Sequence, residues 1–402
     1  MKSKKTLWPK PYSAYKRIAK KGSPMNFDFT EEQNMLRDSV ARFVQDNYTF
    51  DTRQQIAASD TAMSEQNWQT FAELGWLSIP FAEEHGGFDG DAVDIVLMME
   101  QLGKGLVLEP YLATVVLFGG LLSQGGNAQQ QSTIIPTIID GSCQGAFAYA
   151  ERQSRFELAD VKTLAKPSPE GFVLTGEKVV VINGANAAQF IVSARSSGDQ
   201  ADETGISLFL LPADAKGLMI TRYRMMDGQL VANLVLQDVT VSGSALVGEL
   251  DAGYTLMESV ILQANVALAA EAVGIMQELN TKTLEYSKTR EQFGVAIGSF
   301  QALQHRMVDT FMAYEQVKSL LYRAVCAMTD ETRDAAIAVH ALKVLLDKNS
   351  KLVFGEAIQI HGGMGLTDEL DIGHFAKRLM MINTTFGDGD FHQSRFNALR
   401  YS

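Results

Sequence analysis

Arg290-Glu-Gln-Phe293-Gly294 is the first of four charged, amide-rich or glycine-rich segments in the last third of a chain that is otherwise apolar and helical in pattern there. The other three are Phe300-Gln301-Ala-Leu-Gln304-His305-Arg306, Gln359-Ile-His361-Gly362-Gly363-Met-Gly365 and Phe386-Gly-Asp388-Gly389-Asp390. Gly-Gly-x-Gly directly after a helical run lets backbone N–H groups approach a ligand with no side chain in the way. We therefore expect these segments to form a ligand site.

The sequence around these segments changes its hydrophobic period twice. A capping box, Thr30-Glu-Glu-Gln33, opens an amphipathic helix, and a helical pattern continues to about Asp140. Between Phe147 and Gly248, short β-branched runs alternate with turn signals such as Asn183-Gly184, which is typical of strands. A helical pattern with short connections then returns, which predicts a helical bundle.

These periods predict an α+β multidomain fold, which fits the length of 402 residues. We expect a basic extension over residues 1–26 and a helical N-terminal domain over 27–141. A β-barrel or β-sandwich domain over 142–249 and a four-helix bundle over 250–402 follow.

Composition narrows the class of partner. A net charge of −12 argues against nucleic acid as the main ligand, because phosphate binding needs a basic surface. We see no uninterrupted apolar stretch near the roughly 20 residues of a membrane span. The basic N-terminus contains Pro9 and Pro11 and favours Lys over Arg, which argues against a transit peptide. We expect a cytoplasmic protein of bacterial type.

In this order and spacing, the four segments resemble the C-terminal domain of acyl-CoA dehydrogenases, and the domain order also matches that family. The resemblance implies FAD as cofactor, an acyl-CoA substrate and α,β-dehydrogenation of its thioester, in fatty acid or dicarboxylic acid degradation. It also implies an oligomer and an electron acceptor such as an electron-transfer flavoprotein. His305 and His361 have no metal-type spacing, so we expect no metal site.

The same resemblance assigns the FAD site. It implies that Arg290 meets the FAD pyrophosphate of a neighbouring subunit, a task that suits a planar guanidinium. Phe293, Gln301 and Gln359 would complete the nucleotide site, with Gly362 and Gly363 leaving the backbone open to the ligand. Taken alone, Arg290 could be a helix-end charge and Phe293 a core residue.

The catalytic base is assigned less directly. Most members carry a glutamate in a Tyr-Glu-Gly-Thr segment with an arginine seven residues later, and Asp388 falls on that glutamate, with Arg395 as the arginine. An aspartate is shorter, so the backbone or substrate must move by ~1–1.5 Å. Alternatively, Asp388 could simply cap the final helix. The base position of the isovaleryl and long-chain branches is Ala264, and nearby Glu271 could be a substitute base or part of an ion pair.

Other departures set the chain apart from ordinary members. The glycine-rich flavin loop is replaced by Ala150-Glu-Arg-Gln-Ser-Arg-Phe-Glu157, and Ile182 replaces a threonine that bonds the flavin. These features resemble the small subunits of pimeloyl-CoA-type dehydrogenases. The chain could therefore be an active dehydrogenase, a non-catalytic partner that completes the FAD site of another subunit, or a flavin oxidase or monooxygenase on the same scaffold.

Overall fold

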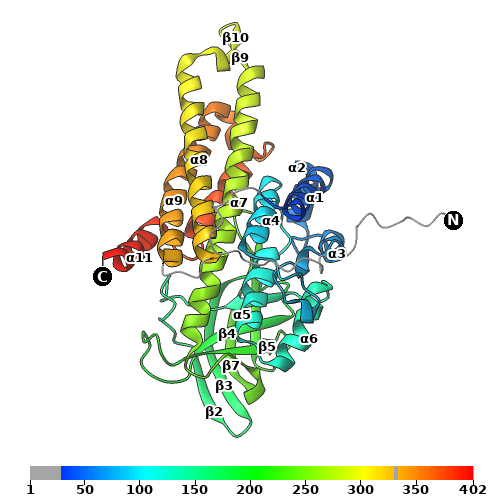
Figure 1. Cartoon of the computed structure of the whole chain (residues 1–402), viewed down its shortest axis with the longest axis vertical. Helices are drawn as coiled ribbons and strands as arrows, with labels where there is room; N and C mark the ends of the chain where they lie inside the picture. Colours follow the sequence, from blue (N-terminus) through cyan, green and yellow to red (C-terminus); the bar gives the residue numbers. More distant parts are fainter. Residues whose placement is uncertain (1–28, 330–333, 402) are drawn as a thin grey trace, which may run out of the picture.

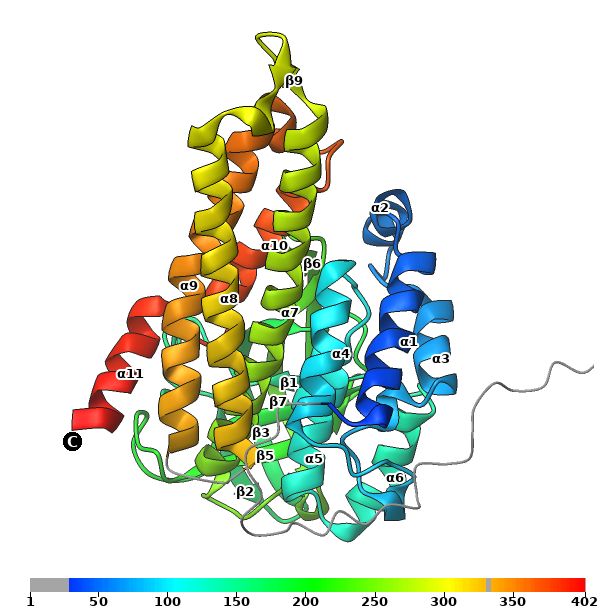
Figure 2. The same ribbon diagram turned by 45° about the horizontal axis from the view of Figure 1, so that its top comes forward.

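The computed structural model describes residues 29–329 and 334–401, so the predicted basic extension over 1–26 lies outside the described residues. The chain forms two helical parts and a β-domain that lies between them in sequence and at the lower end of the molecule in Figure 1. Figure 2 shows the N-terminal helices on one side, the C-terminal bundle on the other, and the sheet below both. The predicted α+β architecture, helical, then β, then helical, is confirmed.

The N-terminal domain is built from short helices around an apolar core. Its α-helices are α1 (Glu31–Asn47), α2 (Phe50–Ala58), α3 (Glu65–Glu73), α4 (Ala92–Lys104), α5 (Gly120–Gly125) and α6 (Ala128–Ile139). Short 3-10 helices η1 (Trp76–Ser78) and η2 (Glu83–His85) and a π-helical segment η3 (Leu112–Gly119) connect them. The predicted capping box is present at α1, where the Thr30 hydroxyl accepts from the Gln33 backbone N–H at 3.2 Å.

The middle domain is a single twisted sheet with its own core. Its strands are β1 (Gly145–Ala148), β2 (Leu164–Ser168), β3 (Gly171–Ile182), β4 (Gln189–Arg195), β5 (Ile206–Pro212), β6 (Leu218–Arg224), β7 (Leu230–Ser242) and β8 (Leu246–Val247). Their order is β6-β7-β3-β2-β4-β5-β8, with β1 parallel to β4. A register shift near Val180, which has a φ of +53°, bends β3 beside the C-terminal domain.

The C-terminal domain is built on the long helices α7 (Gly253–Thr289), α8 (Gln301–Thr329) and α9 (Asp334–His361). A small hairpin, β9 (Glu291–Gln292) and β10 (Val295–Ala296), and a short turn η5 (Ile297–Ser299) join α7 to α8. The turn η6 (Gly362–Leu366) and the shorter helices α10 (Ile372–Thr384) and α11 (Gly389–Tyr401) complete the domain.

Helix α7 is the central helix of the molecule. It is long and apolar enough to cross a membrane by length and composition, which the sequence prediction did not single out. In its most apolar window, however, 83% of the residues are buried inside the fold, so its hydropathy is explained by packing.

Helices α4 and α7 approach closely because a glycine on each helix faces the backbone of the other. A Cβ added to Gly103 would lie 2.2 Å from the Glu271 carbonyl oxygen, and one added to Gly274 would lie 1.9 Å from that of Glu100. Larger side chains would push the helices apart. This contact holds the N-terminal domain against α7, and the cavity described next lies beside it.

Candidate active site

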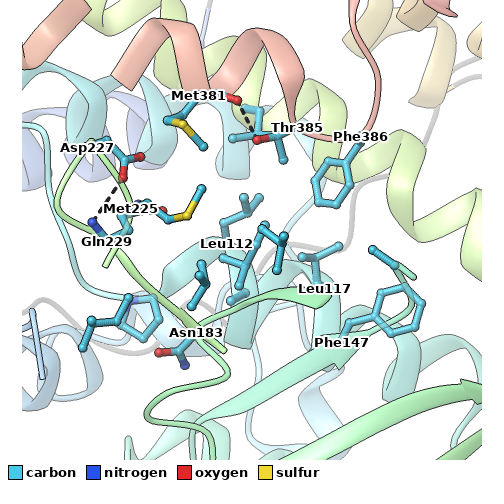
Figure 3. A pocket seen from close by; sticks show the side chains of 18 of the residues that line it. Leu112, Leu117, Phe147, Asn183, Met225, Asp227, Gln229, Met381, Thr385 and Phe386 are labelled. Carbon is cyan, nitrogen blue, oxygen red and sulfur yellow. Dashed lines mark hydrogen bonds between the residues drawn. The ribbon is translucent and has the colours of Figure 1, made fainter. Parts of the chain in front are cut away.

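A cavity of about 410 Å³ lies where the three domains meet, a size within the usual range of about 300–1,000 Å³ for ligand sites. The N-terminal domain contributes apolar side chains from α4 and η3, including Met99, Leu102 and Leu112. The sheet contributes the segment after β1 and the end of β3, and the bundle contributes α7, α10 and Phe386. Figure 3 shows the cavity from close by.

The wall on the side of the sheet is made by backbone and small or apolar side chains. Ala150 and Ile182 both line it, so no side-chain hydroxyl is available at these two positions. At the β3 bulge, the Val179 backbone N–H donates to the Ala150 carbonyl at 2.9 Å. The Val180 N–H donates to the Asn233 side chain at 3.1 Å. This arrangement makes a wall against which a flat ring can lie.

A buried ion pair supports this wall from behind. The Lys178 ammonium lies 2.7 Å from a Glu151 carboxylate oxygen and 3.0 Å from the Ser193 hydroxyl. Glu151 also accepts from the backbone N–H groups of Lys162 and Thr163 at 2.8 and 3.0 Å. Burial opposes ionisation, but the nearby ammonium outweighs it and lowers the pKa of Glu151. The carboxylate therefore acts as a structural anion, and the loop of Ala150 is fixed.

One end of the cavity is polar. Nε and Nη2 of Arg378 donate to the two Glu271 carboxylate oxygens at 2.5 and 2.7 Å. Its Nη1 donates to Asp227 at 2.9 Å and to the Gln229 side-chain oxygen at 3.1 Å. Burial disfavours the charge, but the two carboxylates raise the pKa of Arg378. Of the two roles considered for Glu271, substitute base or ion-pair partner, the structure shows the ion pair, and this pair lines the cavity.

Asp388 lies just outside the cavity, two residues beyond Phe386, which lines it. One Asp388 oxygen accepts from the Phe391 backbone N–H at 2.9 Å, so the side chain caps α11. The other oxygen lies 3.1 Å from the guanidinium of Arg155, whose side chain is 77% exposed. The capping role weighed from the sequence is present, and the base role stays a prediction.

A buried lysine binds the backbone just before the loop that carries Asp388. The Lys343 ammonium, on α9, donates to the carbonyl oxygens of Ile382 and Thr385 at 2.9 and 3.0 Å. Burial lowers the pKa of Lys343 to about 7. Because these carbonyls end α10, Lys343 fixes the point at which the chain turns toward Phe386 and Asp388.

The six predicted nucleotide-binding residues lie together at the far end of the bundle, away from the sheet (Figure 1). They are the exposed residues Arg290, Phe293, Gln301, Gln359, Gly362 and Gly363. Arg290 ends α7, while Phe293 occupies the hairpin tip and is 94% exposed, so it is no core residue. A Cβ added to Gly362 or Gly363 would meet no atom within 4 Å. The site is thus an open surface that a single chain leaves uncovered.

Comparison with known proteins identifies the family. Residues 30–142, 146–239 and 251–395 match the N-terminal, middle and C-terminal domains of acyl-CoA dehydrogenases. The chain belongs to the acyl-CoA dehydrogenase family. These proteins are FAD-dependent oxidoreductases, so the family, fold, enzyme class and cofactor predicted from the sequence are confirmed.

Three proteins illustrate the similarity. The probable acyl-CoA dehydrogenase YngJ of Bacillus subtilis (strain 168) is 30% identical over 374 residues, covering 92% of this chain and 98% of YngJ. PigA, solved with FAD and proline, superposes with a TM-score of 0.87 at 26% identity, covering 93% and 98% of the two chains. A variant of the Tcur3481-Tcur3483 steroid ACAD superposes with a TM-score of 0.83 at 27% identity, covering 92% of this chain and 97% of that chain.

FAD consists of a flat isoalloxazine ring and a nucleotide, and this chain offers a surface for each. The backbone wall at β3 and the α10 side of the cavity are the surfaces that would hold a flat isoalloxazine ring, with peptide groups in place of the missing hydroxyls at Ala150 and Ile182. Gly362 and Gly363 lie on an open surface where an added Cβ would meet no atom within 4 Å, so their backbone is accessible to a nucleotide. The residues present therefore fit FAD, with the ring and nucleotide contacts on different parts of the chain.

Sequence reasoning missed the polar end of the cavity apart from Glu271. Asp227 and Gln229 precede β7 and come from a turn, and Arg378 lies in an apolar helical run. A charged residue inside such a run, with buried neighbours Phe375 and Leu379, was the available signal. Nothing in the sequence indicated its partners, because Arg378 and Glu271 are 107 residues apart.

Proposed function

We propose that the chain oxidises the Cα–Cβ bond of an acyl-CoA thioester to the enoyl-CoA. The observation that carries this proposal is the junction of three domains, where a backbone wall faces the Phe386 loop across a mainly apolar cavity. FAD, when bound, supplies the two-electron acceptor for the hydrogen lost from Cβ. The protein must then bind the acyl group, exclude water and remove the proton from Cα.

The residues of this chain would divide those tasks. Leu112, Met99 and Leu102 cover the acyl group and exclude water. A carboxylate oxygen of Asp388 would accept the α-proton after a small movement of its loop, because in the resting chain it is held by Arg155 and by the α11 cap. Arg152 and Arg155 line the cavity and are largely exposed, so they supply local positive charge for phosphates on an acidic protein.

The direct test is an anaerobic titration of the purified flavoprotein with saturated acyl-CoAs of increasing chain length, followed by absorbance. We expect at least one acyl-CoA to bleach the oxidised flavin band, and the enoyl-CoA to be recovered as product. Retention of the oxidised spectrum with every acyl-CoA, both for the chain alone and for the chain with its partner subunits, would refute the proposed reaction. Fast reoxidation in air would favour an oxidase.

Arg290→Ala is expected to weaken FAD retention by roughly 1.5–3 kcal/mol, the value of a hydrogen bond to a charged group. The reason is that the exposed guanidinium at the end of α7 would meet the pyrophosphate of a neighbouring subunit. Flavin occupancy and affinity are measured in the assembled oligomer. Lys288→Ala, a nearby exposed charge paired with Glu285, is the control. Equal flavin affinity of both variants and the parent would remove Arg290 from the site.

A half-site partner subunit is the second candidate, and the absence of side-chain hydroxyls at Ala150 and Ile182 in the cavity wall favours it. The six exposed nucleotide candidates would then serve the FAD site of another chain. These residues lie at the end of the bundle, so a second chain is needed to use them. That chain could be a copy of this one or a different dehydrogenase-like chain. Flavin content of the protein produced alone and together with such a chain separates the two possibilities, since a partner subunit would hold flavin only in the pair.

A further inference from the structure

The polar end of the cavity is unsuited to a plain alkyl tail. Figure 3 shows Asp227 and Gln229 at one end, opposite Phe147 and Phe386, with Met225 also lining the cavity. Glu271 and Arg378 line the same polar end. A saturated chain placed against these groups would displace water from them and return no hydrogen bond, which costs free energy.

The hydrogen bonds of this end are incomplete. The Gln229 side-chain oxygen accepts from Arg378, but among residues 29–329 and 334–401 no acceptor receives the N–H groups of its amide nitrogen. Likewise, in that part of the chain, the Glu271 carboxylate accepts only from Arg378, so each oxygen keeps a free lone pair. The cavity therefore offers both an unused donor and unused acceptors to whatever occupies it.

Within the buried group of Arg53, Asp227, Glu271 and Arg378, the formal charges cancel. Arg378 is balanced by Glu271 and Asp227, and the remaining negative charge is matched by Arg53, whose Nη2 donates to the Asp227 backbone carbonyl at 2.7 Å. Arg53 is 3% exposed, so it belongs to the same buried group. A ligand carboxylate would add an uncompensated negative charge to this buried group, which is strongly unfavourable. A neutral group adds none.

We infer that the cavity selects an acyl group whose far end carries a neutral oxygen function, a hydroxyl or a keto group, held by Gln229. A hydroxyl suits the site best, because it can accept from the Gln229 amide and donate to the Glu271 carboxylate. A keto oxygen uses only the first of these contacts. This inference deepens the proposed acyl-CoA dehydrogenase function and rests on it. It excludes both unsubstituted fatty acyl groups and ω-carboxyl acyl groups as the preferred substrates.

The test compares octanoyl-CoA, 8-hydroxyoctanoyl-CoA and suberoyl-CoA, together with the six- and ten-carbon equivalents, on the holoenzyme. Anaerobic flavin-reduction rates and calorimetric affinities are measured for the parent and for Gln229→Leu. In the parent, we expect the hydroxyacyl-CoA of the fitting length to bind roughly tenfold more tightly, and to reduce the flavin faster, than the alkyl and ω-carboxyl compounds of the same length. This is the effect of one additional buried hydrogen bond. Gln229→Leu should abolish this preference or reverse it toward the alkyl compound.

Gln237→Leu is the matched control, because Gln237 is an exposed glutamine on the neighbouring strand β7 and should keep the parent preference. A parent that prefers alkyl or ω-carboxyl compounds at every length overturns the inference. So does a Gln229→Leu variant that changes flavin content while selectivity stays the same, since Gln229 would then serve the cofactor. If no acyl-CoA reduces the flavin, the proposed reaction fails, while the calorimetric affinities still decide the preference.

Discussion

Asp388→Asn is expected to slow flavin reduction by a good acyl-CoA by at least about a hundredfold, the usual scale for loss of a general base. The amide cannot accept the α-proton, although it keeps nearly the same shape. Asparagine is also a good helix cap, so the contact with the Phe391 N–H can persist. The lost pair with Arg155 is exposed and contributes little to stability. Rapid single-turnover kinetics gives the rate.

Two further variants make this result specific. Asp388→Glu should keep far more activity than the asparagine variant, because it restores the family's usual carboxylate and a longer reach. Asp390→Asn changes an exposed aspartate in the same helical turn and should leave the rate close to that of the parent. If Asp388→Asn reduces its flavin at the parent rate, the base lies elsewhere in the protein, and Glu271 is the next carboxylate to replace.

The fold was predictable because its signals are local. The capping box at Thr30 and the change of hydrophobic period after Gly253 each depend on residues that are close in sequence, and both appear as predicted. The grouping of Arg290, Gln301 and Gln359 at one end of the bundle follows from helix lengths once the family is known. The break between α7 and α8 was likewise marked by Gly294.

The chemistry of the cavity was less predictable because it depends on contacts between domains. Asp227 comes from a sheet turn, Glu271 from α7 and Arg378 from α10, and no local pattern brings these three together. The role of Asp388 is also undetermined by sequence, since Asp388 falls on the position of the family's glutamate base and, in this chain, also caps α11. Only the packing of α10 against α7, within the C-terminal domain, shows that Glu271 is already engaged by an arginine.

Arg378→Met is expected to destabilise the protein by about 3–5 kcal/mol, because it removes the buried cation that pairs with both the Glu271 and the Asp227 carboxylates. Methionine fills much of the space, so the loss is mainly electrostatic. Urea denaturation measures the change. Lys377→Met is the control: Lys377 pairs with the exposed Asp368, and such surface pairs are typically worth about 0–1 kcal/mol. A similar loss in both variants would contradict the electrostatic explanation.

A second substitution separates charge from packing. Without the guanidinium, Glu271 stays buried with no counter-ion, and an unpaired buried charge costs free energy. Adding Glu271→Leu removes that charge, so the double variant should lose less stability in urea than Arg378→Met alone. A double variant that is as unstable as Arg378→Met, or less stable, would assign the loss to packing.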